Sequence, residues 1–537
     1  MSHHISRRGF LKVVGIAAAS LAFDPVAFGD IKKKPNILYI MADDQSPESV
    51  ACYGGWMKDH VQTSNIDKLA AEGMRFENCV CTNSLCAPSR ASIATGQYSH
   101  KTGVYTLRED MDTKDKPTSY SVLNKAGYQT AVFGKWHVHG DNKYGLDDYG
   151  VTISQGSYYN PTLTGPGGIK RRFSGMHSTD AYTYASLEWL DKRDKDKPFL
   201  LMCHYKAAHG DWIYAKRFEE LYADVEIPEP ATLFDDYSNR ASGGVNNKKA
   251  KLYPNLAHQV CGNGKKPGAP KRDWPTGNID LSGMDEKQQK KATFQKYAKD
   301  YMRCVAGINE NVGKLVKYLK DEGILENTIV IYTADQGMYV GEHGFYDKRL
   351  MLEEGLRMPF IVRYPKMIKS GAVTKALVNN VDFAPTLLDL AGEKTPSSMQ
   401  GKSFADVLKG KKDKHRKSSF YAFYSNGVQK HYGVRTERYK LIVWAESGLK
   451  DLFDIVNDPH ELTSLYGDPK YVSLVKEMEE ELKNAMIDAD IAENELPGKR
   501  LVANKVKATK DDKVKPAKEK KQKVKVKKKN KHNNISN

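Results

Sequence analysis

No apolar run in this sequence of 537 residues, once its N-terminal region is passed, approaches the ~18–20 residues that a transmembrane helix needs. The seven cysteines include no pair with Cys-x-x-Cys spacing, so they do not indicate a structural zinc site. No internal repeat is apparent. The remaining composition, 40% hydrophobic and 28% charged, is ordinary for a globular protein. The length suits two domains, or one large domain with a smaller one attached.

The N-terminal region has the features of an export signal. Arg7 and Arg8 precede a modest apolar run at 13–23, and 27–29 offers a small-x-small cleavage site. This order resembles a twin-arginine signal, which predicts a signal peptide at 1–29 and export by the bacterial twin-arginine machinery, to the periplasm or the medium. A basic amphipathic helix is the alternative. No lipobox cysteine follows the run, so no lipid anchor is predicted.

The net charge of +17 comes largely from the C-terminal end. Residues 501–537 contain fourteen lysines and three acidic residues, and they lack aromatics. Such a segment cannot bury a core, so 496–537 is predicted to be a disordered Lys-rich tail. It is either a solvated extension without function or an electrostatic contact with acidic polysaccharide or the cell surface. Nucleic-acid binding is not expected of an exported protein.

Five short apolar runs have strand character, and polar, loop-like residues follow each; they lie at 36–41, 130–133, 199–203, 328–333 and 360–363. Helical patterns intervene, the clearest at 297–319, where apolar residues recur every three or four positions. This alternation predicts a mainly parallel sheet covered on both faces, with the ligand beyond the carboxyl ends of the strands. We predict a long surface insertion at 227–283 that shapes the pocket, then short antiparallel strands between 420 and 453 and a helix at 471–486.

Carboxylates and a carboxamide follow two of these runs. Asp43 and Asp44 come directly after the first run, and Asp335 and Gln336 come after the fourth. Adjacent carboxylates repel each other unless a cation lies between them. Four oxygen-bearing side chains suit calcium or magnesium and not zinc, although each pair alone is also ordinary turn chemistry.

Cys86 opens the run Cys-Ala-Pro-Ser-Arg, which predicts a helix beginning just after it, with Pro88 near its first position and Gly96 at its end. An anion is stabilised at such a helix N-terminus, and Arg90 adds a permanent positive charge. With its Thr95-Gly96 ending, the run resembles the signature of the type I sulfatases. An ordinary buried or reactive thiol is the alternative.

This resemblance implies that Cys86 is oxidised to formylglycine by a formylglycine-generating or maturating enzyme. Conversion would also account for one cysteine of an odd number in an exported chain. The family further implies one divalent cation, Ca²⁺ or Mg²⁺, held by Asp43, Asp44, the formylglycine at position 86, Asp335 and Gln336. A glutamine stands where the family more often has asparagine or histidine, which leaves the coordination open.

Further motifs carry the same resemblance. Gly-Lys-Trp-His at 134–137 implies that Lys135 and His137 contact the sulfate and the formylglycine hydrate. The run Lys-Ala-Ala-His at 206–209, where related chains have Lys-Ala-Pro-His, makes His209 the implied acid for the leaving alcohol. His204 is interpreted as structural. Lys348 matches a sulfate-binding lysine.

Two neighbours of Lys348 are open to two interpretations, since His343 and Arg349 either bind sulfate or have structural roles. In the implied reaction a hydroxyl of the hydrated aldehyde attacks sulfur, and the second hydroxyl later expels sulfate with help from His137. Arg90, two lysines and the cation stabilise the sulfate oxygens, while His209 protonates the sugar oxygen.

The resemblance covers about 35–466 and implies an alkaline-phosphatase-like α/β sandwich with a large, mainly parallel central sheet flanked by helices. We expect a catalytic domain at 30–399 and a C-terminal α+β subdomain with an antiparallel sheet at 400–495. The implied function is hydrolysis of sulfate esters on a carbohydrate: ulvan, carrageenan, a glycosaminoglycan or a mucin glycan. The alternatives are a phosphonate or phosphate ester hydrolase of the same superfamily and a catalytically idle polysaccharide-binding protein. Every expected catalytic position is filled, which favours the enzyme.

Overall fold

The computed structural model describes residues 34–499, apart from 112, 114–115, 242–244, 266–268 and 425–427. The predicted signal peptide at 1–29 and residues 500–537 of the tail predicted at 496–537 lie outside the described residues. Leu496 is buried in the C-terminal core, so the folded part of the chain extends past the predicted start of the tail. Within the described residues, no helix is both long enough and apolar enough to pass through a bilayer.

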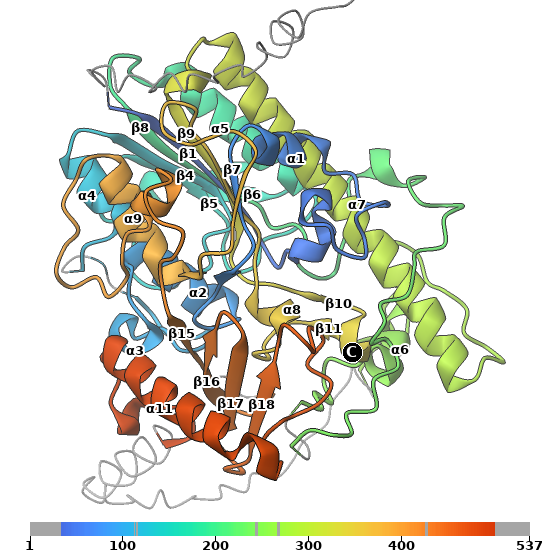
Figure 1. The fold of residues 1–537 in the computed structure, drawn as a ribbon. Coiled ribbons are helices and arrows are strands. Elements are labelled where there is room, and N and C mark those ends of the chain that lie inside the picture. The colour runs from blue at the N-terminus through green and yellow to red at the C-terminus, as the bar shows by residue number, and fades with distance from the viewer. Residues whose placement is uncertain are drawn as a thin grey trace, which may run out of the picture.

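A mixed sheet of ten strands forms the centre of the described chain (Figure 1). Each of the five predicted strand runs is a strand of this sheet. In spatial order the strands are β13 (Ala372–Thr374), β2 (Met74–Phe76), β12 (Phe360–Arg363), β9 (Thr328–Ala334), β1 (Asn36–Ala42), β8 (Phe199–His204), β4 (Gln129–Gly134), β5 (Asp148–Val151), β6 (Thr162–Thr164) and β7 (Lys170–Arg172).

The middle of the sheet is parallel. β1 pairs with β9 on one side and β8 on the other, and β4 and β5 continue the same direction beyond β8. Ala42 lies opposite Ala334, and Gly134 lies opposite His204, so four strands end at one edge. The antiparallel pairs lie toward the two sides of the sheet: β12 with β2 and with β9, β6 with β5, and β7 with β6. The carboxyl ends of four of the five predicted apolar runs therefore meet, as the sequence predicts. The fifth run, β12, is antiparallel to β9, so its carboxyl end lies at the opposite edge of the sheet.

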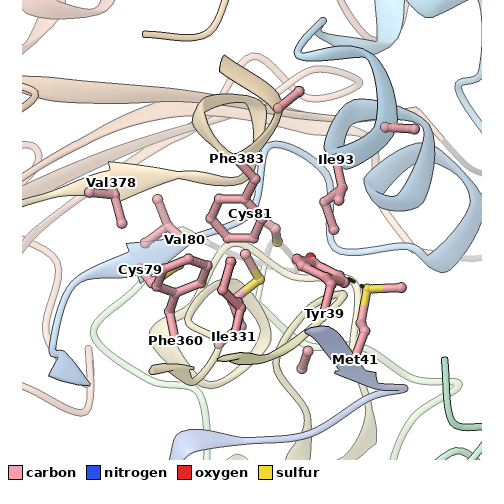
Figure 2. Close-up of a cluster of buried hydrophobic side chains, with 14 of the residues drawn as sticks. Tyr39, Met41, Cys79, Val80, Cys81, Ile93, Ile331, Phe360, Val378 and Phe383 are labelled. Carbon is pink, nitrogen blue, oxygen red and sulfur yellow. Dashed lines mark hydrogen bonds between the residues drawn. The ribbon is translucent and has the colours of Figure 1, made fainter. Parts of the chain in front are cut away.

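Alternate residues of β1 separate the core into two layers. Ile37, Tyr39 and Met41 pack beneath α2 (Cys86–Thr95), α4 (Ser119–Lys125) and α9 (Phe383–Leu390). Leu38 and Ile40 pack on the other face, against α1 (Ser64–Ala71), α5 (Ser178–Lys192) and α7 (Glu286–Asp321). Figure 2 shows the first layer, where aromatic and aliphatic side chains from β1, β9, β12, α2 and α9 meet. A strand buried on both faces needs a continuous apolar run, which the sequence supplies.

The helix predicted at 297–319 is part of a longer helix, α7. It begins with a capping box in which the Asp285 side chain accepts from the backbone N–H of Gln288, and Gln288 returns a bond to the Asp285 N–H. The buried stripe of α7 covers the second core layer. Its N-terminal part extends beside the predicted insertion (Figure 1).

The C-terminal part contains the predicted antiparallel sheet and helix (Figure 1). The strands are β15 (Ser418–Phe423), β16 (His431–Thr436), β17 (Tyr439–Trp444) and β18 (Lys450–Asp454), paired in that order. Helix α11 (Val472–Asp488) packs on one face of the sheet through Met478, Leu482 and Ala485.

The predicted insertion at 227–283 is irregular over most of its described length and contains the short helix α6 (Ala257–Val260). Small elements complete the connections. They are α3 (Ser99–Thr102), α8 (Glu353–Leu356), α10 (Ala405–Leu408) and the strand pairs β3 (Cys79–Val80) with β14 (Val378–Asn379) and β10 (Tyr339–Val340) with β11 (Tyr346–Asp347).

Candidate active site

Three of the predicted site residues directly follow the ends of parallel strands of the central sheet. Asp43 follows β1, Lys135 follows β4 and Asp335 follows β9. The N–H of Asp43 donates to the carbonyl of Ala207 over 2.9 Å, and the N–H of Lys135 donates to the carbonyl of His204 over 2.8 Å. These bonds extend the sheet past the strand ends, so the functional side chains start from a rigid frame.

Two glycines are required at this edge. Gly134 has a φ of +116°, and a Cβ there would collide with the carbonyl oxygen of His204. A Cβ on Gly337 would collide with the carbonyl oxygens of Glu354 and Arg357. The glycines in Gly-Lys-Trp-His and Asp-Gln-Gly are therefore explained by close backbone approach.

Helix α2 positions Cys86. The helix begins at Cys86 itself, one residue earlier than predicted, and Pro88 occupies its third position. Gly96, with a φ of +63°, ends the helix as predicted. The Ser89 hydroxyl donates to the carbonyl of Asp335, which fastens the first turn of the helix to the end of β9.

The buried thiol of Cys86 faces the acidic groups. Its sulfur lies 3.4 Å from Asp43 Oδ1, 3.8 Å from Asp44 Oδ1 and 3.8 Å from Lys135 Nζ. Burial, reinforced by Asp43, holds the pKa of the Cys86 thiol above its usual value. Despite the helix N-terminus, the unmodified thiol is therefore not an activated thiolate. All seven cysteines have free thiols.

Three carboxylates converge on this point. Asp43, Asp44 and Asp335 are fully buried, and one oxygen from each lies within 4.8 Å of the others. Burial and the charge of Asp43 raise the pKa of Asp335 to about 7. Burial also acts on Asp43, but Lys135 and other cations outweigh it and hold the pKa of Asp43 well below its usual value. The pKa values of crowded carboxylates spread in this way because each negative charge disfavours ionisation of its neighbours.

The fourth predicted ligand fits a cation as well. Gln336 Nε2 donates to Asp44, while its Oε1 is buried and has no partner within the described part of the chain. An unpaired carboxamide oxygen beside three carboxylates is a donor set for a hard divalent cation such as Ca²⁺ or Mg²⁺. The residues present therefore fit the cation that the sequence predicts.

Three basic side chains contact the carboxylates. Lys135 Nζ lies on Asp43, and Lys348 Nζ lies on Asp44. Arg90 Nε is 2.8 Å from Asp335 Oδ2, and a terminal nitrogen of Arg90 is 3.4 Å from Asp43 Oδ1. The three basic groups balance the three carboxylates, so an added divalent cation would leave the site positive. A site with that balance attracts an anionic ester.

Two histidines lie beside these groups. His137 Nε2 is 3.3 Å from Gln155 Nε2, and burial together with Lys135 lowers the pKa of His137 to about 2. His209 Nδ1 donates to the carbonyl of Gly210 over 2.8 Å, and its Nε2 lies 3.7 Å from Asp44 Oδ2. Burial and the nearby lysines lower the pKa of His209 well below its usual value. Both imidazoles are therefore neutral in the ligand-free protein.

The site opens into a cleft of about 580 Å³, a size typical of small-molecule sites. Its walls come from 155–159, 209–213, the predicted insertion and 346–349. Asp44, His209 and Lys348 line its inner end. Another groove, of about 600 Å³, lies between α1 and α7 and is lined by other residues, so we take the first cleft as the candidate site.

The structure brings together all of the predicted site residues: Asp43, Asp44, Cys86, Arg90, Lys135, His137, His209, Asp335, Gln336 and Lys348. Of the two residues left open, Arg349 lines the cleft, with its Nε 2.7 Å from Asp347 Oδ2. His343 is instead fully buried, with its Nδ1 2.6 Å from Asp235 Oδ2. Its structural interpretation is the one that fits. His204 is also buried, stacked on Trp136.

Sequence reasoning missed most of the cleft wall. Gln155, Lys206 and Asp211 line the cleft or contact a predicted residue, yet none of them was singled out. Asp347 had a usable signal, because it directly precedes Lys348. Lys206 opens the Lys-Ala-Ala-His run, in which only His209 received a role. Gln155 and Asp211 come from irregular segments without a motif, so no sequence signal marked them.

Comparison with known proteins defines the class. The sulfatase family model matches residues 35–393, and a model described as N-sulphoglucosamine sulphohydrolase, C-terminal, matches 341–488. The chain therefore belongs to the sulfatase family, and it is a sulfate ester hydrolase. Its fold is the expected alkaline-phosphatase-like arrangement of a large, mostly parallel sheet with helices and a small antiparallel sheet.

Three individual proteins are similar to this chain over most of their length. The chain is 37% identical over 500 residues to an N-acetylglucosamine-6-O-sulfatase of Bacteroides thetaiotaomicron, covering 86% of this chain and 88% of that protein. It is 26% identical over 482 residues to an ulvan-active sulfatase of Formosa agariphila, covering 83% and 79%. A solved protein in complex with its substrate D-glucosamine-2-N,6-O-disulfate matches with a TM-score of 0.80 and 34% identity, over 86% of this chain and 99% of that one.

Proposed function

We propose that this sulfatase removes the 6-O-sulfate of a glucosamine-type residue in a sulfated glycan. The observation that carries the proposal is the convergence of Cys86, three buried carboxylates and three basic side chains, of which Asp44 and Lys348 line the inner end of one cleft. The choice of sugar follows two relatives, one named an N-acetylglucosamine-6-O-sulfatase and one bound to D-glucosamine-2-N,6-O-disulfate.

The proposal includes formylglycine at position 86. Its hydrate would supply one hydroxyl that attacks sulfur and displaces the sugar oxygen, and a second hydroxyl whose collapse to the aldehyde would break the C–O bond to sulfate. An unmodified cysteine has no second hydroxyl. The raised pKa of the Cys86 thiol supports this, because the thiol itself is a poor nucleophile where it lies. A divalent cation held by Asp43, Asp44, Asp335 and Gln336 would supply charge stabilisation at the same point.

Lys135 and Lys348 are the groups we propose for the sulfate oxygens. In the ligand-free protein each ammonium lies on a carboxylate of the cation site. Once the carboxylates are neutralised, both ammonium groups are available to a sulfate ester beside residue 86. Arg90 contacts Asp335 and Asp43 and donates to the carbonyl of Lys135, so it holds the site together as well as adding charge.

The two histidines are proposed to handle protons. His209 is the donor to the leaving sugar oxygen because it lines the cleft next to Asp44. It is neutral without substrate, but the negative charge of a bound sulfate favours the protonated form and raises its pKa. His137 is the acceptor that helps sulfate leave: its ring is neutral in the ligand-free protein, and the negative charge of the bound sulfate would raise its pKa and favour uptake of the proton.

We propose export through the twin-arginine machinery to the periplasm or the medium, and maturation by a formylglycine-generating enzyme. The division into a catalytic domain at 30–399 and a C-terminal subdomain at 400–495 is likewise proposed. The antiparallel sheet β15–β18 and the cluster of buried residues between it and α11 support that division.

The test measures release of inorganic sulfate from N-acetylglucosamine 6-sulfate, N-acetylglucosamine 3-sulfate and N-acetylgalactosamine 6-sulfate. The proposal predicts the highest kcat/KM for the first. The matched ester N-acetylglucosamine 6-phosphate separates a sulfatase from a phosphate ester hydrolase, and Cys86→Ala controls for contaminating activity. Preference for another sulfate position or sugar would overturn the substrate assignment, and faster phosphate release would overturn the proposed reaction.

A further inference from the structure

The side chains that line the cleft carry more positive than negative charge. The acidic side chains on the wall each have a basic partner: Asp347 lies 2.7 Å from Arg349, and Asp211 lies 3.6 Å from Arg272. Lys206 lines the same cleft, but within the described part of the chain its ammonium makes no ion pair and no hydrogen bond. The wall therefore carries an unpaired positive charge.

Lys206 is also buried, with only 5% of the residue exposed. It is the second residue after β8, and its ammonium lies 4.8 Å from the centroid of the Tyr158 ring. The Tyr158 hydroxyl donates to the carbonyl of His209, so one aromatic ring contacts both Lys206 and the backbone of the proposed acid. A ring face attracts an ammonium more weakly than a carboxylate or sulfate does.

The surroundings of Lys206 disfavour its charged form, and its pKa is lowered accordingly. Burial, followed by the charge of Lys135, lowers its pKa to about 8 against the opposing pull of Asp43, Asp211 and Asp44. A buried charge without a partner destabilises the ligand-free protein. An anion that enters the cleft would remove that penalty.

We propose that Lys206 binds a second anionic substituent of the substrate, a sulfate or carboxylate other than the ester that is cleaved. This inference rests on the proposed function and deepens it. The cleaved ester must lie at residue 86, where Lys135 and Gln336 contact the Cys86 sulfur and Lys206 does not. Lys206 lies on the wall instead, so its partner is a different group on the same sugar or on its neighbour.

The second anion is either a sulfate on the same sugar ring or a carboxylate on the neighbouring ring, and three substrates distinguish these two possibilities. N-acetylglucosamine 6-sulfate carries one anion. D-glucosamine-2-N,6-O-disulfate adds a second sulfate on the same ring. A disaccharide of 6-sulfated N-acetylglucosamine and a uronic acid adds a carboxylate on the neighbouring ring. The ratio of kcat/KM for each dianionic substrate to that for the monosulfate identifies which group Lys206 contacts.

The decisive variant is Lys206→Met, which removes the charge and keeps the length of the side chain. We expect the wild type to prefer one dianionic substrate, and the variant to lose about tenfold to a hundredfold of that preference, the worth of a hydrogen bond between charged groups. Lys206→Arg should retain most of it. Lys265→Gln, at an exposed position on the same cleft, is the matched control and should leave the preference in place.

Thermal unfolding adds a readout that separates binding from a structural role. Because Lys206 has no ion pair to lose, Lys206→Met should unfold at the wild-type temperature or above it, whereas a structural lysine would lower that temperature. A preference that survives Lys206→Met, or a wild type with no preference, would overturn this inference alone. If the wild type releases no sulfate from any 6-sulfated glucosamine, the proposed function fails, and this inference fails with it.

Discussion

Replacing His343 with asparagine tests whether a buried cation holds the loop that carries Lys348. His343 is fully buried, with Nδ1 2.6 Å from Asp235 Oδ2 and Nε2 3.6 Å from Glu354 Oε2. Its backbone N–H donates to Thr232 Oγ1 over 2.9 Å. The φ of His343 is +54°, a conformation that asparagine also adopts. The variant therefore removes the imidazolium while keeping the local backbone conformation accessible.

The expected effect follows from the pKa of His343. Burial lowers this pKa, but Glu354 and Asp235 outweigh burial and raise it from 6.5 to about 9. At about 1.4 kcal/mol for each tenfold change in proton affinity, the raised pKa corresponds to about 3 kcal/mol of folding stability. A raised folded-state pKa stabilises most below the unfolded value of 6.5, and the stabilisation disappears as the pH rises through 9. Wild type and variant should therefore differ most at pH 6 and least at pH 10.

The assay is urea unfolding of both proteins at several values between pH 6 and pH 10. Subtracting the two free energies of unfolding removes the titrations that they share. We expect the difference to shrink by about 3 kcal/mol across this range. The matched control is His431→Asn, because burial lowers the pKa of His431 to about 4 and keeps that ring neutral throughout. A wild-type minus His343→Asn difference that stays constant with pH would refute the reasoning.

Three further outcomes are expected. Chelation should abolish sulfate release and added Ca²⁺ or Mg²⁺ should restore it, while Asp335→Ala should lower cation content measured by atomic emission; full activity without metal would contradict this. His209→Ala should reduce kcat by about 10²–10⁴ on a sugar sulfate and by much less on 4-nitrophenyl sulfate, whose leaving group needs no proton. Equal losses would count against its role as an acid. Deleting 501–537 should leave aryl sulfate kinetics unchanged and raise the apparent KM for a polymeric substrate only at low salt; identical polymer kinetics at every salt concentration would argue against a tether.

Three residues of the site could be predicted because each of them directly follows a strand that the sequence pattern reveals. Asp43, Lys135 and Asp335 each follow an apolar run, and parallel pairing carries those ends to one edge. Cys86 could be placed because a helix start has local signals. The same reasoning predicted the five central strands and the C-terminal sheet, since their patterns depend on residues close in the sequence.

The walls of the cleft depend on contacts that sequence spacing does not encode. Tyr158 reaches the carbonyl of His209, 51 residues away, and Asp235 in the insertion reaches His343, 108 residues away. The string Gly-Glu-His-Gly is compatible with either role for His343, and the position of Asp235 decides between them. Lys206 was overlooked for the same reason, because its burial becomes visible only once the wall is folded.

The proposed reaction depends on conversion of Cys86 to the formylglycine nucleophile. Its most direct test is mass spectrometry of the peptide that contains residue 86, isolated from exported protein whose sulfate release has been measured. We expect the aldehyde or its hydrate at this position, in a fraction that rises in step with specific activity, and no activity in folded Cys86→Ala. Fully active protein in which residue 86 remains an unmodified cysteine would contradict it.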